Sequence, residues 1–266
     1  MYDQGARTAI SKRMILRIDS ATTQQDLASC TADGRQRAAA FATLNQDSRA
    51  ARIKLCLGSA ALFGFIYVAS LPWHPYPMSY LVKAMPALIL AGLALSVLIG
   101  RDRILMPLAY VAAAAGDVFL DLDGTAYLAQ GLGCFLVMQV LFCWVFGSRA
   151  RWTPARAPLI AGLAAIGIAI IVVAWQDLGA MRLPVTIYVA ALLSMVATAT
   201  MVRGSPWVGL GAVFFMISDA LIGINHFIVA FDYAVQIFVA LYMAAQLLIA
   251  WGIFAGTIED SGAGKA

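Results

Sequence analysis

Eight apolar runs follow one another along this chain, and each is close to the length that a bilayer requires. A helix needs about 20 apolar residues to cross the hydrocarbon core of a membrane. Runs of that length occur at 53–71, 79–99, 104–121, 126–147, 157–175, 183–202, 207–228 and 233–254. Short segments rich in Gly, Pro, Asp or Arg separate them. The sequence therefore predicts an all-α polytopic membrane helical bundle with eight transmembrane helices.

The composition excludes a soluble domain. Only 12% of the 266 residues are charged and 62% are hydrophobic, whereas a soluble domain carries about 25% charged residues. The net charge of +4 is interpreted as charge on the loops between helices. The expected partner is therefore the lipid bilayer, and no nucleic acid is expected. With two histidines and no Cys-x-x-Cys pair among four cysteines, a metal site is not expected.

The polar segments predict how the chain is divided and oriented. Residues 1–52 are polar and basic and are expected to form a flexible cytoplasmic tail, 53–254 the membrane domain, and 255–266 a short cytoplasmic tail. Because positive charge favours cytoplasmic loops, both termini are predicted to be cytoplasmic, in the inner (cytoplasmic) membrane of a bacterium. The arginines behind this prediction are Arg101, Arg103, Arg149, Arg151, Arg156 and Arg203 in inner loops, against Arg182 in an outer loop.

Two segments of the chain resemble each other. The third run reads Ala-Gly-Asp-Val-Phe-Leu around Asp117, and the seventh reads Ile-Ser-Asp-Ala-Leu-Ile around Asp219. The helix after each carries a glutamine near mid-span, Gln139 and Gln246. A parallel duplication of four helices plus four would explain this pattern; a chance likeness between helices rich in small residues is the alternative.

Four ionisable residues lie on the predicted spans: Lys83, Asp117, Asp121 and Asp219. A charged group at the centre of a bilayer costs about 2.5–3.5 kcal/mol on insertion scales, so such groups normally face the bundle interior. With the predicted topology all four fall in the outer half of the membrane, where they would line one cavity open to the outer leaflet. A Lys–Asp bridge that only fixes helix packing is the competing interpretation.

The residue types favour acid–base chemistry. Two carboxyl groups in different environments can hold different protonation states. Polar residues that would complete the cavity are Tyr188, Tyr242, Gln139, Gln246 and Ser218, although each could instead form an interhelical hydrogen bond. His74, in a Pro-rich loop, is expected at the surface, and His226 at the membrane interface.

In their order along eight spans, these residues resemble the YhhN-like family of lysoplasmalogenases, over about residues 55–254. The matching elements are Lys83-Ala84-Met85-Pro86, Gly116-Asp117 with Leu120, Ser218-Asp219 with Leu221, and Tyr242 with Gln246. The chain departs from the family at two places. Ala84 and Met85 separate a lysine and proline that are often adjacent, and Gln139 stands where the family often has a histidine.

The resemblance implies hydrolysis of the vinyl ether bond of lysoplasmalogens, which are lysophospholipids, with no metal or redox cofactor. On this hypothesis Asp117 and Asp219 are the acid and the base, in an order that the sequence leaves open, and Lys83 keeps one carboxylate ionised or contacts the phosphate. Tyr188, Tyr242 and Gln246 would orient the ether and water. Asp121 would contact the head group.

Two other functions fit the sequence. Intramembrane Asp and Lys residues also mark proton relays, so a small proton-coupled transporter is one alternative. It would need a polar route through both halves of the membrane, whereas the charges on the spans are predicted in the outer half alone. A non-catalytic membrane protein of the same family is the other alternative.

Overall fold

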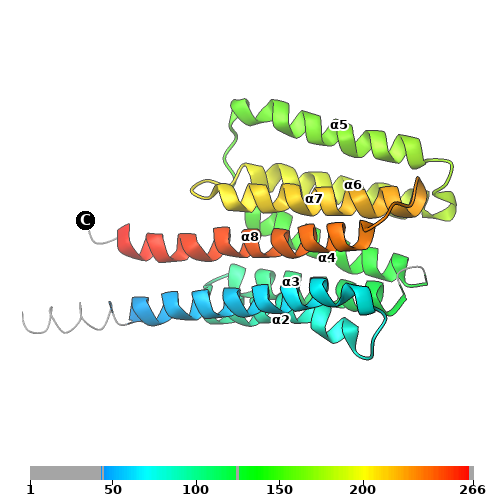
Figure 1. The fold of residues 1–266 in the computed structure, drawn as a ribbon. Helices are drawn as coiled ribbons and strands as arrows, with labels where there is room; N and C mark the ends of the chain where they lie inside the picture. The colour runs from blue at the N-terminus through cyan, green and yellow to red at the C-terminus, as the bar shows by residue number, and fades with distance from the viewer. Residues whose placement is uncertain (1–42, 44, 124–125, 264–266) are drawn as a thin grey trace, which may run out of the picture. The chain divides into compact units, whose positions relative to one another are not determined.

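The structure is a computed structural model that describes residues 43, 45–123 and 126–263. In this part of the chain eight helices are long and apolar enough to cross a membrane, which confirms the predicted all-helical membrane architecture. The first spans Asn45–Trp73 and ends in a 3₁₀ turn, Leu71–Trp73. The others are α2 (Ser79–Val97), α3 (Asp102–Asp123), α4 (Leu128–Gly147), α5 (Ala157–Ala174), α6 (Arg182–Thr200), α7 (Pro206–Phe227) and α8 (Ala234–Ala263) (Figure 1).

Most helix ends fall within a few residues of their predicted positions, but the two terminal helices are longer than expected. Among the described residues the first helix already begins at Asn45, before the predicted start at 53. The last helix continues to Ala263, beyond the predicted end at 254. The predicted N-terminal tail lies largely outside the described residues. The chain divides into two units, 1–49 and 50–266, and the description below concerns the second.

Six helices of this unit form a closed ring. Going round it, α2 contacts α3, α3 contacts α4, α4 contacts α6, α6 contacts α7, α7 contacts α8, and α8 returns to α2. Helix α5 lies outside the ring, against α6 and α7 (Figure 1). The first helix packs against α8, where Gly64 lies beside Met243. The interior of the ring is where polar side chains can be kept from lipid.

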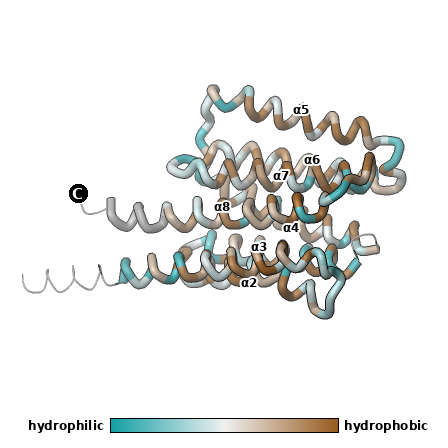
Figure 2. The backbone as a smooth tube through the Cα atoms, in the orientation of Figure 1, coloured by the Kyte–Doolittle hydropathy of each residue, from teal (hydrophilic) through white to brown (hydrophobic). Residues whose placement is uncertain are grey.

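Apolar residues cover the lengths of the helices, and hydrophilic residues gather at the connecting loops (Figure 2). Large apolar side chains remain exposed on the outside of the unit, including Phe65 at 71%, Val172 at 66% and Leu183 at 69%. Exposed apolar area on this scale is unfavourable in water and matches a lipid environment. The loops carry the expected turn signals: Gly204 has a positive φ of 82°, and Pro206 starts α7.

The tightest contact in the ring is between α7 and α8, and it depends on glycine. A Cβ atom on Gly211 would lie 2.8 Å from the carbonyl oxygen of Ala245 and 2.9 Å from the backbone nitrogen of Ile249. On the opposite helix, a Cβ atom on Gly252 would lie 2.8 Å from the backbone nitrogen of Val208. Small residues at such contacts let helix backbones approach closely in membranes. This close approach places the inward faces of α7 and α8 side by side.

We expect Gly211→Ala to lower the free energy of unfolding by about 1–3 kcal/mol, because the added methyl group meets backbone atoms that cannot move aside. The measurement is thermal or denaturant unfolding of the purified protein in detergent. Gly92→Ala is the matched control, since a Cβ atom there has open space and alanine favours a helix over glycine. Equal loss of stability in both variants would contradict this description of the α7–α8 contact.

Candidate active site

A cavity of about 450 Å³ lies toward the end of the ring where odd-numbered helices end and even-numbered helices begin. Its polar lining includes three carboxyl groups and one lysine, the same four ionisable residues that the sequence places on the spans. The polar side chains of the lining are Tyr67, His74, Lys83, Asp117, Asp121, Tyr188, Ser218, Asp219, Asn225, His226 and Tyr242. The structure therefore brings the four together around one space.

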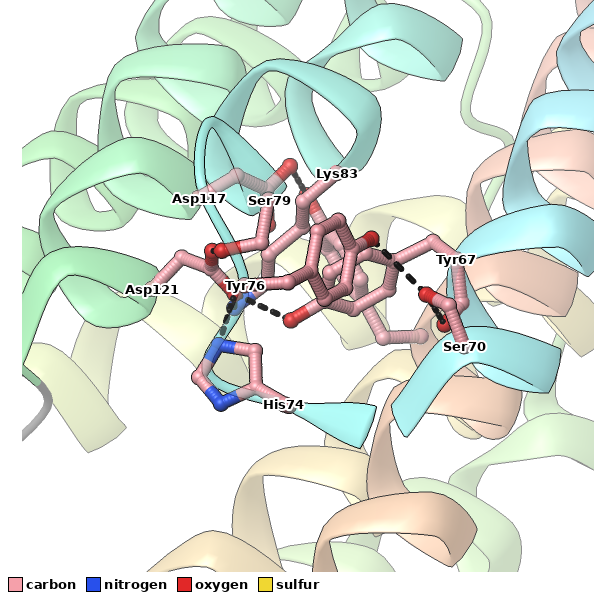
Figure 3. A network of polar contacts seen from close by, with 9 residues as sticks. Tyr67, Ser70, His74, Tyr76, Ser79, Lys83, Asp117 and Asp121 are labelled. Carbon is pink, nitrogen blue, oxygen red and sulfur yellow. Dashed lines mark hydrogen bonds and ion pairs between the residues drawn. The ribbon is translucent and has the colours of Figure 1, made fainter. Parts of the chain in front are cut away.

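Asp121 is the most extensively bonded of the three carboxyl groups (Figure 3). Its side chain is 1% exposed. It accepts hydrogen bonds from the hydroxyl of Tyr67 on the first helix and from the Ser79 hydroxyl at the start of α2, the latter at 2.5 Å. His74 Nε2 lies 3.3 Å from Asp121 Oδ1, and Lys83 Nζ lies 4.0 Å from the same atom. Four partners on three segments thus converge on one buried carboxylate.

Asp117 lies one helical turn before Asp121 and is 1% exposed. Its Oδ2 atom accepts a hydrogen bond from the Tyr242 hydroxyl of α8 at 2.7 Å. The Tyr242 oxygen in turn accepts a hydrogen bond from Gln246 Nε2, one turn further along α8. Lys83 is close enough to act electrostatically on Asp117 as well as on Asp121. Asp117 is therefore held by a tyrosine and shares a nearby cation.

Asp219, on α7, has a different environment. Its Oδ2 atom accepts a hydrogen bond from the Tyr188 hydroxyl of α6 at 2.5 Å. Among the described residues it has no ion-pair partner, because the salt bridges near the cavity involve Asp121 only. Gln139 of α4 lies beside Tyr188, is fully buried, and makes no hydrogen bond through either amide atom to the described residues. Asp219 is partly exposed and lines the cavity.

Aromatic rings pack around Tyr242, the partner of Asp117. Phe135 of α4 makes an edge contact with Tyr242 at 5.7 Å between ring centroids, and Phe215 of α7 makes one with Tyr242 at 5.8 Å. The Phe135 ring lies on Gly116, where a Cβ atom would be 2.8 Å from it. Glycine beside Asp117 is thus required for α4 to approach α3. These rings give the Asp117–Tyr242 pair apolar surroundings.

The rest of the cavity is apolar, and α5 supplies much of its wall. The lining residues of α5 and the facing part of α6 are Gly167, Ile170, Ile171, Ala174, Val185, Val189 and Leu192. Gly167 packs close to Leu193 of α6, where a Cβ atom would come within 3.3 Å. The cavity thus combines polar side chains with an apolar wall from α5 and α6, which suits a molecule with a polar head and a hydrocarbon chain.

The predicted site residues do not all reach the cavity in the same way. Ser218 lines it but donates its hydroxyl hydrogen to the backbone oxygen of Phe238, at 2.8 Å, and so also ties α7 to α8. Gln139 and Gln246 do not line it and lie behind Tyr188 and Tyr242. The predicted residues that do line it are Lys83, Asp117, Asp121, Tyr188, Ser218, Asp219 and Tyr242.

Sequence reasoning missed three contributors to the site, Tyr67, Ser79 and Asn225, and undervalued His74 and His226. Tyr67 and Ser79 bond Asp121 but look like ordinary residues near helix ends. His74 lies at the surface as expected, yet its ring reaches Asp121. A buried carboxylate needs several hydrogen-bond donors, and neighbouring segments must supply them. This requirement was the available signal for Tyr67 and Ser79.

Comparison with known proteins identifies the same region of the chain. The model of the YhhN family matches residues 78–253. The chain is 35% identical over 182 residues to proteins named lysoplasmalogenase from Mycobacterium tuberculosis and Mycobacterium bovis, covering 65% of this chain and 69% of each relative. It is 30% identical over 172 residues to lysoplasmalogenase TMEM86B from Homo sapiens, covering 64% of this chain and 72% of that protein. No solved structure matches the chain significantly.

Two tyrosines provide a paired test of the Asp121 contacts. Tyr67→Phe removes a donor from a buried carboxylate, and we expect a loss of about 1–3 kcal/mol in the free energy of unfolding. Tyr110→Phe is the matched control, because the buried Tyr110 hydroxyl has no hydrogen-bond partner among the described residues. Its loss should be far smaller when both variants are unfolded in the same detergent. If Tyr110→Phe were the more damaging change, Tyr67 would not support Asp121 as described.

Proposed function

The chain belongs to the YhhN family, and from that premise we propose that it is a membrane hydrolase that cleaves the vinyl ether bond of lysoplasmalogens. The observation that carries the proposal is the pair of carboxyl groups, Asp117 and Asp219, each bonded to its own tyrosine on one cavity. The names of the mycobacterial and human relatives support the same activity.

The chemistry requires what this site contains. Hydrolysis of a vinyl ether begins when a general acid adds a proton to the alkene carbon and creates an oxocarbenium ion. A nearby carboxylate can then stabilise the cation and activate water. Capture by water gives a hemiacetal, which collapses to an aldehyde and the glycerol hydroxyl of the other product. Two carboxyl groups are sufficient for these proton transfers.

The shape of the cavity supports a one-chain phospholipid as substrate. Its volume of about 450 Å³ lies in the range of small-molecule sites, roughly 300–1,000 Å³. The alkenyl chain would lie along the apolar wall of α5 and α6. The head group would lie toward His74 and Lys83, at the polar end of the cavity.

We also propose an orientation in the membrane. The cavity end of the unit would face the outside of the cytoplasmic membrane of a bacterium, and the arginine-rich loops would face the cytoplasm. At the opposite end from the cavity, Arg149 Nη2 pairs with Asp102 Oδ2 at 2.5 Å. A 4+4 duplication remains a prediction, motivated by the matching positions of Asp117 on α3 and Asp219 on α7.

The activity is tested by mixing the purified protein with lysoplasmenylethanolamine or lysoplasmenylcholine and measuring aldehyde release. We expect release from both vinyl ethers and none from the saturated ether analogue. Asp117→Asn and Asp219→Asn should each lower the rate by about 10²–10⁴-fold, the usual contribution of a general acid or base. Asp232→Asn, an exposed carboxyl group in the loop after α7, is the matched control and should retain the wild-type rate. Full activity in both folded site variants would exclude the proposed site.

Chain-length preference tests the place given to the alkenyl chain. Ala174, on α5, is 3% exposed and lines the apolar end of the cavity. Ala174→Phe should therefore raise the KM of long-chain substrates about tenfold or more and leave short-chain substrates nearly unchanged. Val172→Phe, on the exposed side of the same helix, is the control and should affect neither. A uniform effect on all chain lengths would place the chain elsewhere.

A further inference from the structure

The two Asp–Tyr pairs are not equivalent, and their differences assign the two catalytic roles. Resting on the proposed function, we propose that Asp219 is the general acid that protonates the alkene carbon, and that Asp117 is the ionised carboxylate that takes a proton from the attacking water. The assignment follows from the hydrogen bonds around Asp117, the position of Lys83, and the accessibility of each carboxyl group.

Hydrogen bonding around Asp117 favours its ionised form. The Tyr242 oxygen accepts a hydrogen bond from Gln246 Nε2, so the single hydroxyl hydrogen of Tyr242 is directed to Asp117. Tyr242 is the hydrogen-bond partner that the structure gives Asp117. A proton on Asp117 would find no acceptor there, because Tyr242 already donates. An acceptor-only carboxylate fits this arrangement.

The position of Lys83 favours the same assignment. Its ammonium group lies 4.0 Å from Asp121 and acts electrostatically on Asp117. Asp121 is an unsuitable acid or base, because Tyr67, Ser79 and His74 also hold its oxygens. The negative charge of Asp117 therefore has a cation close by, which a buried charge needs.

Asp219 has no such cation among the described residues, and its apolar surroundings make an unpaired charge there costly. The Tyr188 hydroxyl donates to one oxygen of Asp219, and no cation stands beside the other among the described residues. A neutral carboxylic acid is therefore the less costly resting state at Asp219, whereas Lys83 compensates a negative charge at Asp117.

Accessibility agrees with these roles. The proton donor must touch the substrate carbon, and Asp219 is the partly exposed member of the pair. Asp117, at 1% exposure, also lines the cavity, where its carboxylate can reach the attacking water and the glycerol oxygen. Phe135 and Tyr242 contact each other and also line the cavity.

The proton transfers balance over one turnover. The Asp219 proton bonds to the alkene carbon next to the ether carbon, and the ether carbon becomes the cation. Water bonds to that cation while its proton passes to Asp117, giving a neutral hemiacetal. The bond between the hemiacetal carbon and the glycerol oxygen then breaks. Asp117 returns its proton to the glycerol oxygen, and the Asp219 carboxylate takes the hemiacetal hydroxyl proton. The products are one aldehyde and one alcohol, and both carboxyl groups regain their starting states.

Deuterium exchange separates the two roles. The purified protein is incubated with lysoplasmenylethanolamine in D₂O, and recovered substrate and aldehyde are analysed by mass spectrometry. Wild-type protein should release aldehyde with one deuterium on the carbon next to the carbonyl. Asp117→Asn should still protonate the alkene but fail to complete water addition, so the recovered substrate should gain vinyl deuterium while aldehyde release falls about 100-fold or more. Asp219→Asn should show neither exchange nor release.

A milder pair of variants tests the same assignment if the Asn variants fail to fold. Tyr242→Phe disturbs only the carboxylate side, so deuterium should appear in the recovered substrate at the expense of aldehyde. Tyr188→Phe disturbs only the acid side, so aldehyde release should slow without deuterium in the recovered substrate. Asp232→Asn is again the control, with the wild-type ratio of exchange to release.

Vinyl deuterium in substrate recovered from Asp219→Asn or from Tyr188→Phe would overturn the assignment. So would substrate without vinyl deuterium from both Asp117→Asn and Tyr242→Phe. Either result is compatible with lysoplasmalogen hydrolysis. Failure of the wild-type protein to release aldehyde would instead overturn the proposed function itself.

Discussion

The carboxylate of Asp121 is the point at which the cavity end of the unit is joined together. Tyr67 comes from the first helix, His74 from the loop after it, and Ser79 and Lys83 from α2, while Asp121 itself belongs to α3. A buried carboxylate is tolerated only when hydrogen bonds and a cation compensate for lost hydration. The same requirement brings Lys83 close to Asp117, which lies one helical turn before Asp121 on α3. On the proposed assignment, the electrostatics of Asp117 thus depend on a third acid, Asp121, that exchanges no proton with the substrate.

The helices and the charged residues of the site could be predicted because the bilayer restricts both. An apolar run of about 20 residues has few alternatives to a spanning helix, and a charge within such a run must face the interior. This is why Lys83, Asp117, Asp121 and Asp219 could be selected from the sequence. The partners of each acid could not be derived in the same way. The contact of Tyr188 with Asp219 crosses from α6 to α7, and that of Tyr242 with Asp117 from α8 to α3.

Glycine placement determines how closely several neighbouring helices of the ring approach one another. Gly116 allows the Phe135 ring to lie against α3 beside Asp117, and Gly211 and Gly252 allow α7 and α8 to touch at their backbones. Each glycine resembles many others in an apolar chain when only the sequence is considered. Gly92 shows the contrast, since a Cβ atom there meets open space. The functional difference between such glycines lies in the neighbouring helix, which local sequence patterns do not encode.

Helix α5 stands outside the ring of six helices, contacts α6 and α7, and still forms a wall of the cavity. An element held from one side is easier to displace than a member of a closed ring. A lipid that passes such a wall moves sideways within its own leaflet and never enters water. For a protein supplied in this way, the rate depends on the mole fraction of substrate in the surrounding lipid and not on its concentration in solution.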